Sequence, residues 1–520
     1  MDSIRVKGLR SLIDTGQVSI KPINVLVGTN SSGKSSFLRI FPLIRQSIER
    51  KTKGPILWNG HYVDFESLAT SIHNGPINKL DVLSFCFNMS IPEELAYNPI
   101  AIHSENRDVE ISLEIKLRPG NDINSCYTSN YIIGINGHEL EFHFDEDGII
   151  EKIFSSRLSW ELKKHDLKFQ KSNTDSLLPI FRNSPYFSLN LERQSKVITT
   201  LRNQIIDLIS KFTGSKSENV PHNIFRRVSF NILSDKSKHS LLAGFRSTKK
   251  WEEFVKDDFE DTKYEFLFGL IDLYTILEHS SELNSRLSKS FQNVHYVAPL
   301  RASTERYYRY QDLSVSEIDH TGENLGMFLA NIPEKEKISL NNWTWENFGF
   351  KIKDSPLSSH IAIELVYGES KHSDNIADMG FGFSQILPII VQLWSVASGY
   401  EDRMKGLIKV KKNKTPVIFV IEQPELHLHP KMQASVALAF NIAIKLAIEN
   451  DIDLRLIIET HSQSIISKFS DLIALEELKN TDINIIIFEQ DRASRESTLS
   501  YAMFDEDGDI VNWPSGFFSY

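Results

Sequence analysis

The sequence predicts an α/β protein, in which a mixed sheet and a parallel sheet with flanking helices are interrupted by a helical insert. Residues 1–30 alternate strand and turn patterns and lead into a glycine-rich loop. Residues 411–520 repeat strand, helix and strand, which is typical of a parallel sheet covered by helices. Between these ends, a strand-rich stretch precedes a helix-rich one.

The composition limits the class of protein. A chain of 520 residues exceeds one compact core and predicts two or three lobes. The content of 41% apolar and 24% charged residues is ordinary globular composition. The net charge of −10 excludes a uniformly basic protein that coats nucleic acid, but it leaves room for a local basic patch. Two cysteines, no signal peptide and no apolar run of about 18–20 residues predict a cytoplasmic protein without a membrane span.

The N-terminal part reads as strands. IRVKGLR alternates as a half-buried strand does, and INVLVG predicts a buried strand that ends at Gly28. Alternating segments from about residue 80 to 155 contain Asn-Gly at 136–137 and Asp-Gly at 147–148, which are hairpin turn signals. We therefore expect residues 1–155 to form the N-terminal part of the main domain.

Residues 156–291 are expected to form the helical insert. In YEFLFGLIDLYTILEHSSELNSRL, four apolar residues step by four, three and four: Phe266, Leu270, Leu273 and Leu277. This stripe suits an αα-hairpin or a short coiled coil, and it suits an ordinary amphipathic surface helix equally well. Strand patterns return with NVHYVAPL, so residues 292–520 are expected to fold together with residues 1–155.

The first chemical motif is GTNSSGKS, from Gly28 to Ser35. It fits G-x-x-x-x-G-K-[ST], with the strand before it and the helix after it that this motif requires. The backbone N–H groups of such a loop face phosphate oxygens. Lys34 is expected to reach the β- and γ-phosphates of ATP, and the Ser35 hydroxyl is expected to ligate Mg²⁺. The remaining residues expected to contact the nucleotide are Asn30, Ser31, Ser32, Gly33 and Ser36.

Two further strands deliver polar residues at their carboxyl ends. In VIFVIEQPELHLHP, an apolar run ends at Glu422, as in P-loop proteins that hold the Mg²⁺ shell with a strand-end acid. Glu425 is placed to orient or deprotonate water. IIETHSQSII brings Glu459 and His461 to a third strand end, where His461 is expected near the γ-phosphate. Each segment alone is also compatible with a buried strand followed by a polar loop.

A second glycine-rich segment is ADMGFGFSQILPII. It places four polar or flexible residues just before an apolar helix: Gly380, Gly382, Ser384 and Gln385. A glycine-rich turn at the start of a helix is a second cradle for anions. The signal is weak alone, and its position between the P-loop and the acidic strand strengthens it.

These four segments, in this order, resemble the ATP-binding-cassette (ABC) class of ATPase heads in its SMC-like branch of chromosome maintenance and DNA repair. GFGFSQ, EQPELHLHP, ETHS and the ending DEDGDIVNWPSGFF are most similar to overcoming-lysogenization-defect (OLD) type ATPases. The resemblance implies that two heads pair head to tail around two ATP molecules. Residues Gly380–Gln385 of one chain would then contact the γ-phosphate held by Gly28–Ser35 of the other. It also implies that Glu422 is the magnesium-associated acid, that His461 is the switch histidine, and that His429 lies in the loop between subunits.

The chain departs from this pattern at one catalytic position. Many relatives carry a glutamate directly after the magnesium-associated acid as the hydrolytic base, whereas this chain has Gln423. An amide does not accept a proton as a carboxylate does. Either Glu425 substitutes for that base, or hydrolysis is slow and ATP mainly clamps the dimer. ATP binding is therefore expected, and turnover is left open.

The resemblance also implies partners. OLD-type nucleases carry a Toprim domain after the head, but a domain of about 100 residues does not fit between His461 and Tyr520. The acidic run FDEDGDI is expected to form a hairpin turn and not a nuclease site. In these respects the chain resembles PtuA, the family of ATPase components of Septu-type antiphage systems, which also occur attached to retrons. This implies an HNH-type nuclease partner and, in a retron, a reverse transcriptase with its msDNA, beside self-association into a dimer or a higher oligomer.

Two alternatives stay open. The first is a DNA-repair or chromosome-maintenance ATPase that acts on DNA without a nuclease partner. The second concerns residues 403–414, RMKGLIKVKKNK, which hold six basic residues and no acid. This segment is either a loop solvated by its charges or a contact with a nucleic-acid backbone.

Overall fold

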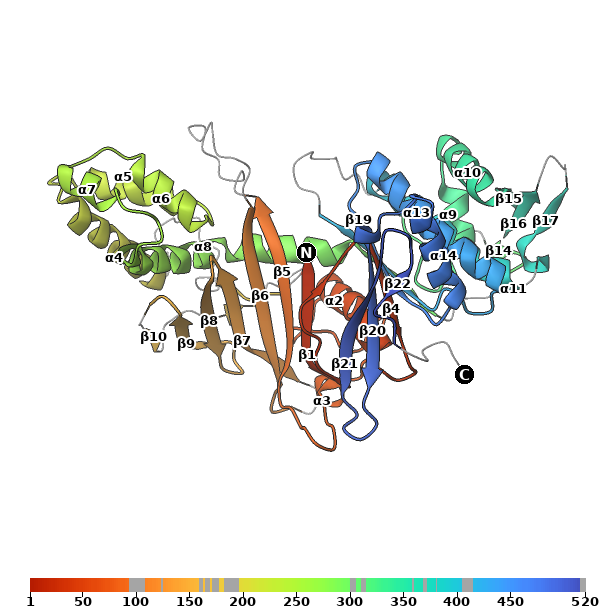
Figure 1. Ribbon diagram of the computed structural model, residues 1–520, viewed down its shortest axis with the longest axis horizontal. Helices are drawn as coiled ribbons and strands as arrows, with labels where there is room; N and C mark the ends of the chain where they lie inside the picture. Colours follow the sequence, from red (N-terminus) through yellow and green to blue (C-terminus); the bar gives the residue numbers. More distant parts are fainter. Residues whose placement is uncertain are drawn as a thin grey trace.

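The computed structural model contains one large mixed sheet and a smaller one, with helices on both faces (Figure 1). It describes residues 1–520 apart from thirteen stretches. These are 93–107, 123–124, 159–161, 164–168, 171–176, 182–195, 300–304, 310–314, 358–359, 368–371, 380, 405–414 and, at the end, 515–520.

Among the described residues the large sheet has 16 strands, and all but two of them, β3 and β22, follow one continuous hydrogen-bonded order. Its antiparallel part contains β1 (Ser3–Leu9), β5 (Leu83–Pro92), β6 (Asp108–Pro119), β7 (Cys126–Ile135), β8 (His138–Phe144), β9 (Ile150–Ser155) and β10 (Leu162–Lys163). Its parallel part contains β13 (Val294–Val297), β18 (Val417–Glu422), β19 (Leu454–Glu459), β4 (Ile23–Gly28) and β20 (Ile483–Gln490). This mixed α/β architecture with flanking helices confirms the predicted fold class.

The two predicted sheets are a single sheet in the structure. The parts meet where β2 (Leu12–Asp14) pairs in parallel with β21 (Ser497–Phe504) through Leu12 and Ser497. Two short strands complete the sheet: β3 (Val18–Ser19) pairs with β1, and β22 (Ile510–Val511) pairs with β21. The short junction explains why the alternation patterns alone suggested two units.

The parallel strands are buried on both faces. Every residue of β4 and β18 is buried, as expected for near-continuous apolar runs in a parallel sheet covered by helices. One face packs on α1 (Lys34–Leu38), α2 (Ile40–Glu49) and α8 (Glu265–Gln292), and the other packs on α11 (Phe381–Ala397), α13 (Pro430–Glu449) and α14 (Gln463–Ala474). Along β18, Ile418 and Val420 belong to the first core, whereas Phe419 and Ile421 belong to the second.

A smaller sheet extends the second core at the right-hand end of the molecule (Figure 1). It consists of β14 (Tyr308–Arg309), β16 (His360–Tyr367), β15 (Phe350–Leu357) and β17 (Ser373–Asn375), with α9 (Leu325–Asn331) and α10 (Glu334–Phe348) against it. The remaining short helices are α3 (Leu68–Ser71), α12 (Tyr400–Met404), η2 (Thr262–Tyr264), η3 (Ile376–Asp378) and η4 (Asn480–Asp482).

The region expected to be a helical insert contains helices and some strands. The helices are α4 (Lys196–Thr213), α5 (Asn219–Val228), α6 (Asp235–Ala243), α7 (Lys249–Phe254) and the long α8. A two-stranded ribbon, β11 (Phe169–Gln170) with β12 (Ile180–Phe181), precedes them. On α8, Phe266 is 50% exposed, but Leu270, Leu273 and Leu277 are buried. Helix α8 therefore acts as a core helix, and in Figure 1 it runs across the antiparallel strands, from α4 toward the centre of the molecule.

One helix, α13, has the length and apolar composition of a membrane span among the described residues. It packs against α11, α14 and β19, so the core of the fold accounts for its apolar side chains.

Candidate functional site

The loop after β4 has a backbone that requires its glycines. Gly28 adopts φ +151°, and a Cβ at this position would lie 2.2 Å from the carbonyl oxygen of Phe488 on β20. Gly33 adopts φ +95° and directly precedes α1. Within the described residues no side chain caps α1, so the N–H groups of its first turn stay available to an anion.

Lys34 lies inside this loop. Its ammonium group donates to the carbonyl oxygens of Gly28 at 3.0 Å and Thr29 at 2.7 Å, and the residue is 3% exposed. Burial lowers the pKa of Lys34, while the neighbouring carboxylates of Glu459 and Glu425 oppose that shift. The loop therefore holds one positive charge at its centre, where the predicted phosphates would bind.

The other predicted loop residues differ in exposure. Asn30 and Ser31 are exposed, and Ser31 adopts a left-handed backbone at φ +65°. Ser32 is buried, and its hydroxyl has no hydrogen-bond partner within the described residues. Ser35 and Ser36 are half-buried.

Ser35 pairs with an acid that was not assigned to the metal from the sequence. Its hydroxyl donates to Oε1 of Glu459 at 2.9 Å. Glu459 ends β19 and is 2% exposed. Burial raises the pKa of Glu459, and the nearby Glu422 carboxylate adds to this, while the Ser35 hydrogen bond, Lys34 and Arg39 lower it.

Glu422 has different partners. Arg39 donates to both of its oxygens, from Nε at 2.7 Å and from Nη2 at 2.8 Å, and the Tyr296 hydroxyl donates to Oε1 at 2.7 Å. Hydrogen bonding to Glu422 raises the pKa of Arg39, and burial raises the pKa of Tyr296. The predicted magnesium-associated acid is thus held in a bidentate ion pair, and within the described residues no hydrogen bond joins it to Ser35.

The helix that follows the P-loop is interrupted at Arg39, and a nearby proline accounts for the interruption. Arg39 separates α1 from α2, and Pro42 follows three residues later. Proline lacks the N–H that would bond to the carbonyl four residues before it, which weakens the helix at this point.

The loop after β18 carries the predicted catalytic residues. Gln423 adopts φ +42°, and its N–H donates to the carbonyl oxygen of Glu459 at 2.9 Å. Glu425 accepts from the backbone N–H of His461 at 2.7 Å through Oε1. His461 is exposed, and its pKa is lowered by partial burial and by the Lys34 charge. The structure therefore brings Glu425 and His461 together beside Lys34.

Side-chain hydrogen bonds hold the loop after β18 against the start of α14. Gln433 of α13 donates to the Leu428 carbonyl oxygen at 3.0 Å and accepts from the Ser462 hydroxyl at 2.6 Å. Ser462 also caps α14 through the Ile465 N–H. His429 is exposed and caps α13 by accepting from the Lys431 N–H at 3.3 Å. A capping role accounts for His429 in the single chain, and its predicted place in the loop between subunits stays a prediction.

The second glycine-rich segment lies apart from the P-loop. Gly380 is outside the described residues, and so is the side chain of Ser384. Gln385 is buried in α11. A Cβ at Gly382 would meet the side chains of Met432 and Leu428 at 3.3 and 3.5 Å. The start of α11 thus adjoins the loop that ends at His429, whereas in Figure 1 the bulk of α11 lies to the right of α14 and α2 lies near the centre.

Sequence reasoning missed Arg39 and Tyr296, and it gave Glu459 no role. A usable signal existed for Glu459, because two consecutive predicted parallel strands both end in glutamate. In the structure Glu422 and Glu459 are register partners on neighbouring strands. No local pattern marked Arg39, which lies 383 residues before its partner.

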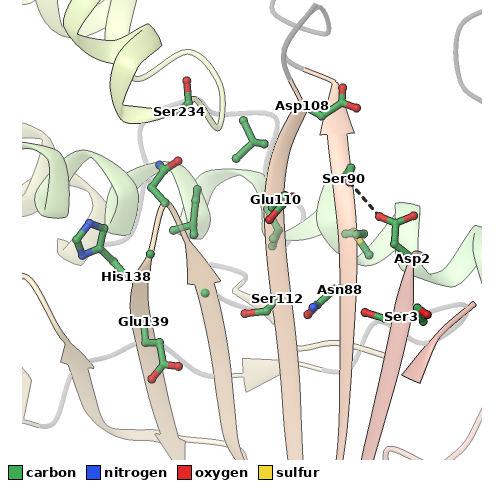
Figure 2. A pocket seen from close by; sticks show the side chains of 18 residues that line it. Asp2, Ser3, Asn88, Ser90, Asp108, Glu110, Ser112, His138, Glu139 and Ser234 are labelled. Carbon is green, nitrogen blue, oxygen red and sulfur yellow. Dashed lines mark hydrogen bonds between the residues drawn. The ribbon is translucent and has the colours of Figure 1, made fainter. Parts of the chain in front are cut away.

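A pocket of about 680 Å³ lies elsewhere, on the antiparallel strands (Figure 2). Its lining includes four acidic residues: Asp2, Asp108, Glu110 and Glu139. Carboxylates repel phosphate groups, and among the described residues no lysine or arginine lines this pocket to offset them. Of the predicted basic segment, only Arg403 and Met404 are described, and Arg403 pairs with Glu336 at 3.0 Å.

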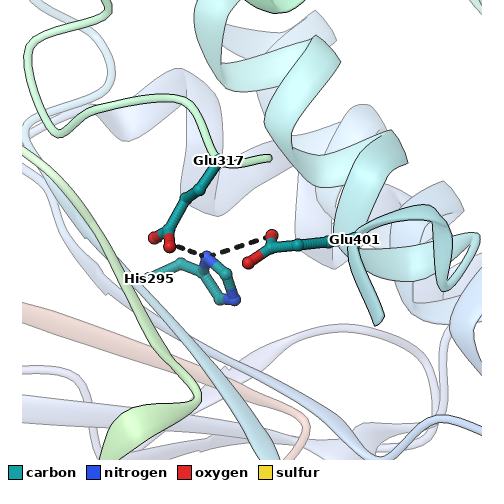
Figure 3. A group of neighbouring side chains, drawn as sticks. All are labelled: His295, Glu317 and Glu401. Carbon is teal, nitrogen blue, oxygen red and sulfur yellow. Dashed lines mark ion pairs between the residues drawn. The ribbon is translucent and has the colours of Figure 1, made fainter. Parts of the chain in front are cut away.

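Figure 3 shows a buried group with metal-ligand chemistry, His295, Glu317 and Glu401, whose ligand atoms lie within 4.8 Å of one another. Arg45 donates to both oxygens of Glu317, at 2.6 and 2.8 Å. Burial raises the pKa of Glu317, but His295 and Arg45 outweigh it and hold that pKa well below its ordinary value. Arg45 also pairs with Glu49 at 2.7 Å, so its charge is shared between two carboxylates. We interpret it as an ion-pair network that joins β13, α2 and α12.

The residues at the carboxyl edge of the parallel sheet fit a nucleotide with its metal. Main-chain N–H groups and Lys34 suit phosphate oxygens, and hydroxyl and carboxylate oxygens suit Mg²⁺. The buried second oxygen of Glu459 has no hydrogen-bond partner within the described residues, which marks an unused ligand atom at this edge.

Comparison with known proteins identifies the family. The AAA ATPase domain matches residues 1–466. A comparison with curated proteins gives no match. Among solved structures, the chain is similar to an Smc head bound to the C-winged helix domain of ScpA, with 10% identity, a TM-score of 0.35, and coverage of 97% of this chain and 98% of that one.

Two further solved structures are similar at the same level. One is an Smc head domain with an extended coiled coil bound to the C-terminal domain of ScpA from Pyrococcus furiosus, with 12% identity, a TM-score of 0.35, and coverage of 96% and 95% of the two chains. The other is the SMC head domain from Thermotoga maritima, with 9% identity, a TM-score of 0.35, and coverage of 96% and 98%. The AAA match spans the P-loop, Glu422 and His461. This protein belongs to the AAA ATPase domain family.

Proposed function

We propose that two copies of this chain bind ATP with Mg²⁺ between them, arranged head to tail, and that this pairing controls a separate HNH-type nuclease in bacterial antiphage defence. ATP acts mainly as a clamp in this proposal, and hydrolysis is slow because Gln423 stands where a catalytic glutamate is usual. In a retron the same assembly would include a reverse transcriptase with its msDNA.

The observation that carries the proposal is the convergence of distant segments at one sheet edge. The P-loop, Glu425, Glu459 and His461 come from three strand ends, and Lys34 interacts electrostatically with all three of the others. The glycines of this loop have no room for a side chain, and its lysine is buried. Such a loop brings backbone N–H groups and a positive charge close to a bound anion.

The arrangement of α11 supports a second copy. The two segments predicted to face a partner, the start of α11 and the loop that ends at His429, adjoin each other through Leu428 and Met432. The same loop reaches the P-loop edge of its own chain through Glu425. A bound nucleotide would therefore lie at an edge that a facing subunit's α11 can complete.

The acidic run near the C-terminus forms a turn. Asp505 accepts from the backbone N–H groups of Asp507 and Asp509, and its own N–H donates to the Asp509 carbonyl oxygen. The Asp505 carboxylate thereby stabilises the turn between β21 and β22, where FDEDGDI predicts a hairpin turn. The HNH assignment itself rests on the resemblance to Septu-type ATPases.

Replacement of Lys34 tests nucleotide binding. We expect K34A to weaken binding of the fluorescent analogue mant-ATP by about 30-fold or more, because loss of a buried charged partner costs about 2 kcal/mol or more. Lys21 at the opposite end of β4 is the matched control, since its ammonium group bonds only to the Ile483 carbonyl oxygen among the described residues. Equal affinities of K34A and K21A would contradict the proposal.

Replacement of Ser384 tests pairing. Light scattering after gel filtration should show the wild-type chain forming dimers with ATP and Mg²⁺, and S384R remaining monomeric while it still binds mant-ATP. A large cation in the interface removes the close approach that the second glycine-rich segment permits. Ser240→Arg on the exposed surface of α6 is the control. ATP-dependent dimers of S384R would show that α11 does not face the partner's nucleotide.

Replacement of Gln423 tests the clamp. A carboxylate in this position restores a general base, which typically contributes at least about 10²-fold to rate. We therefore expect Q423E to raise ATP turnover by that factor and to shorten the lifetime of the ATP-bound dimer. Phosphate release and dimer dissociation are the two measurements. Fast turnover of the wild type that E425Q abolishes would instead show that Glu425 already serves as the base.

Co-purification tests the partner. The tagged chain, expressed with its flanking genes, is expected to retain an HNH polypeptide identified by mass spectrometry, in larger amount with ATP than without it. S384R should retain less, because pairing controls assembly in this proposal. Recovery of the chain with DNA but no nuclease subunit would favour the DNA-repair alternative.

A further inference from the structure

We propose that Glu459, and not Glu422, is the acid that completes the Mg²⁺ site with Ser35. The inference rests on the proposed function, because it concerns the Mg²⁺ that accompanies ATP. The position of Glu422 in the motif favours that residue for this role, whereas the side-chain contacts favour its neighbour.

Glu459 offers an unused ligand atom beside the P-loop. Its Oε1 accepts from the Ser35 hydroxyl at 2.9 Å, and its Oε2 is buried with no hydrogen-bond partner within the described residues. A buried carboxylate oxygen left without a partner costs free energy. Mg²⁺ prefers oxygen ligands of this kind, directly or through its bound waters, so a metal held by Ser35 would also satisfy Glu459.

Both carboxylate oxygens of Glu422 already accept hydrogen bonds. Three hydrogen bonds engage its two oxygens, and the Arg39 guanidinium already balances its charge. Transfer of Glu422 to a metal would leave Arg39 without its carboxylate, or would place the guanidinium next to a divalent cation. Glu422 is the buried member of this pair, so loss of its hydrogen-bond partners is unfavourable.

Strand order gives the same answer independently of the side chains. β19 is hydrogen-bonded to β4, which leads into the P-loop, whereas β18 lies beyond β19. Neighbouring strands are about 4.8 Å apart, so the Cα of Glu422 is one strand spacing farther from the P-loop strand. Glu422 and Glu459 are register partners, so they lie at the same level along the strand direction.

Glu422 then has a positioning role. With Arg39 and Tyr296 it joins the break between α1 and α2 to β13. This ion pair fixes the helix that carries Ser35, and it acts on the metal only through that helix.

The experiment compares mant-ATP affinity in Mg²⁺ and in EDTA, with the full chain. We expect the wild type to bind more tightly in Mg²⁺, and the ratio of the two affinities is the readout. In E459Q this ratio should fall by about tenfold or more, while affinity in EDTA is retained. In E422Q the ratio should fall by less than in E459Q, because Glu422 acts on the metal only through the helix that carries Ser35.

Each outcome decides a different question. Loss of the ratio in E422Q with retention in E459Q, or equal loss in both, would overturn the assignment while ATP binding stands. Failure of the wild type to bind mant-ATP in either condition would refute the proposed function itself. If thermal unfolding shows that E459Q does not fold, E459D keeps the charge on a shorter side chain, and an unchanged ratio in E459D would overturn the assignment.

Discussion

The arrangement of the site depends on two buried carboxylates that the sheet forces side by side. Glu422 and Glu459 end neighbouring parallel strands in register, and each is 2% exposed. Two negative charges in a medium of low dielectric constant require positive partners nearby. Arg39 neutralises Glu422 through two hydrogen bonds. Glu459 has Lys34 in its surroundings, and its second oxygen has no hydrogen-bond partner in the part of the chain that the structure describes, which is the basis for the metal site proposed beside Ser35.

The neighbouring residues at the carboxyl edge of the parallel sheet hold these charged groups in place. Arg39 lies at the break between α1 and α2, and Pro42 weakens the helix there. On the other side, Gln433 and Ser462 latch the loop after β18 to α14, which keeps Glu425 against the His461 backbone. Each of these contacts joins separate elements, so the positions of the charged groups follow from the packing of whole helices.

The P-loop, the strand-end acids and the mixed α/β class were predictable, because each depends on local patterns of apolar and glycine residues. The pairing of Arg39 with Glu422 was not, since it is set by which helix face meets which strand across 383 residues of sequence. The same holds for Ser35 and Glu459, which are 424 residues apart. The stripe on α8 was visible in the sequence, but periodicity does not distinguish a helix that packs in a core from one on the surface. The junction of the sheet at Leu12 and Ser497 is a single register pair and leaves no pattern.

The helical region and the site share a structural element. Helix α8 ends at Gln292, two residues before β13 begins, and β13 supplies Tyr296 to Glu422. Phe291 at the end of α8 packs against Phe41 of α2 and Phe87 of β5, with ring centroids 6.3 and 5.3 Å apart. A shift of α8 along its axis must therefore displace β13, α2 or both, because close-packed interiors do not absorb such a movement. Glu422 is bonded to both sides of this junction, through Tyr296 on β13 and through Arg39 at the start of α2. Glu422 is therefore better placed to connect the helical region with the P-loop than to bind a metal, because a metal ligand must have a free oxygen.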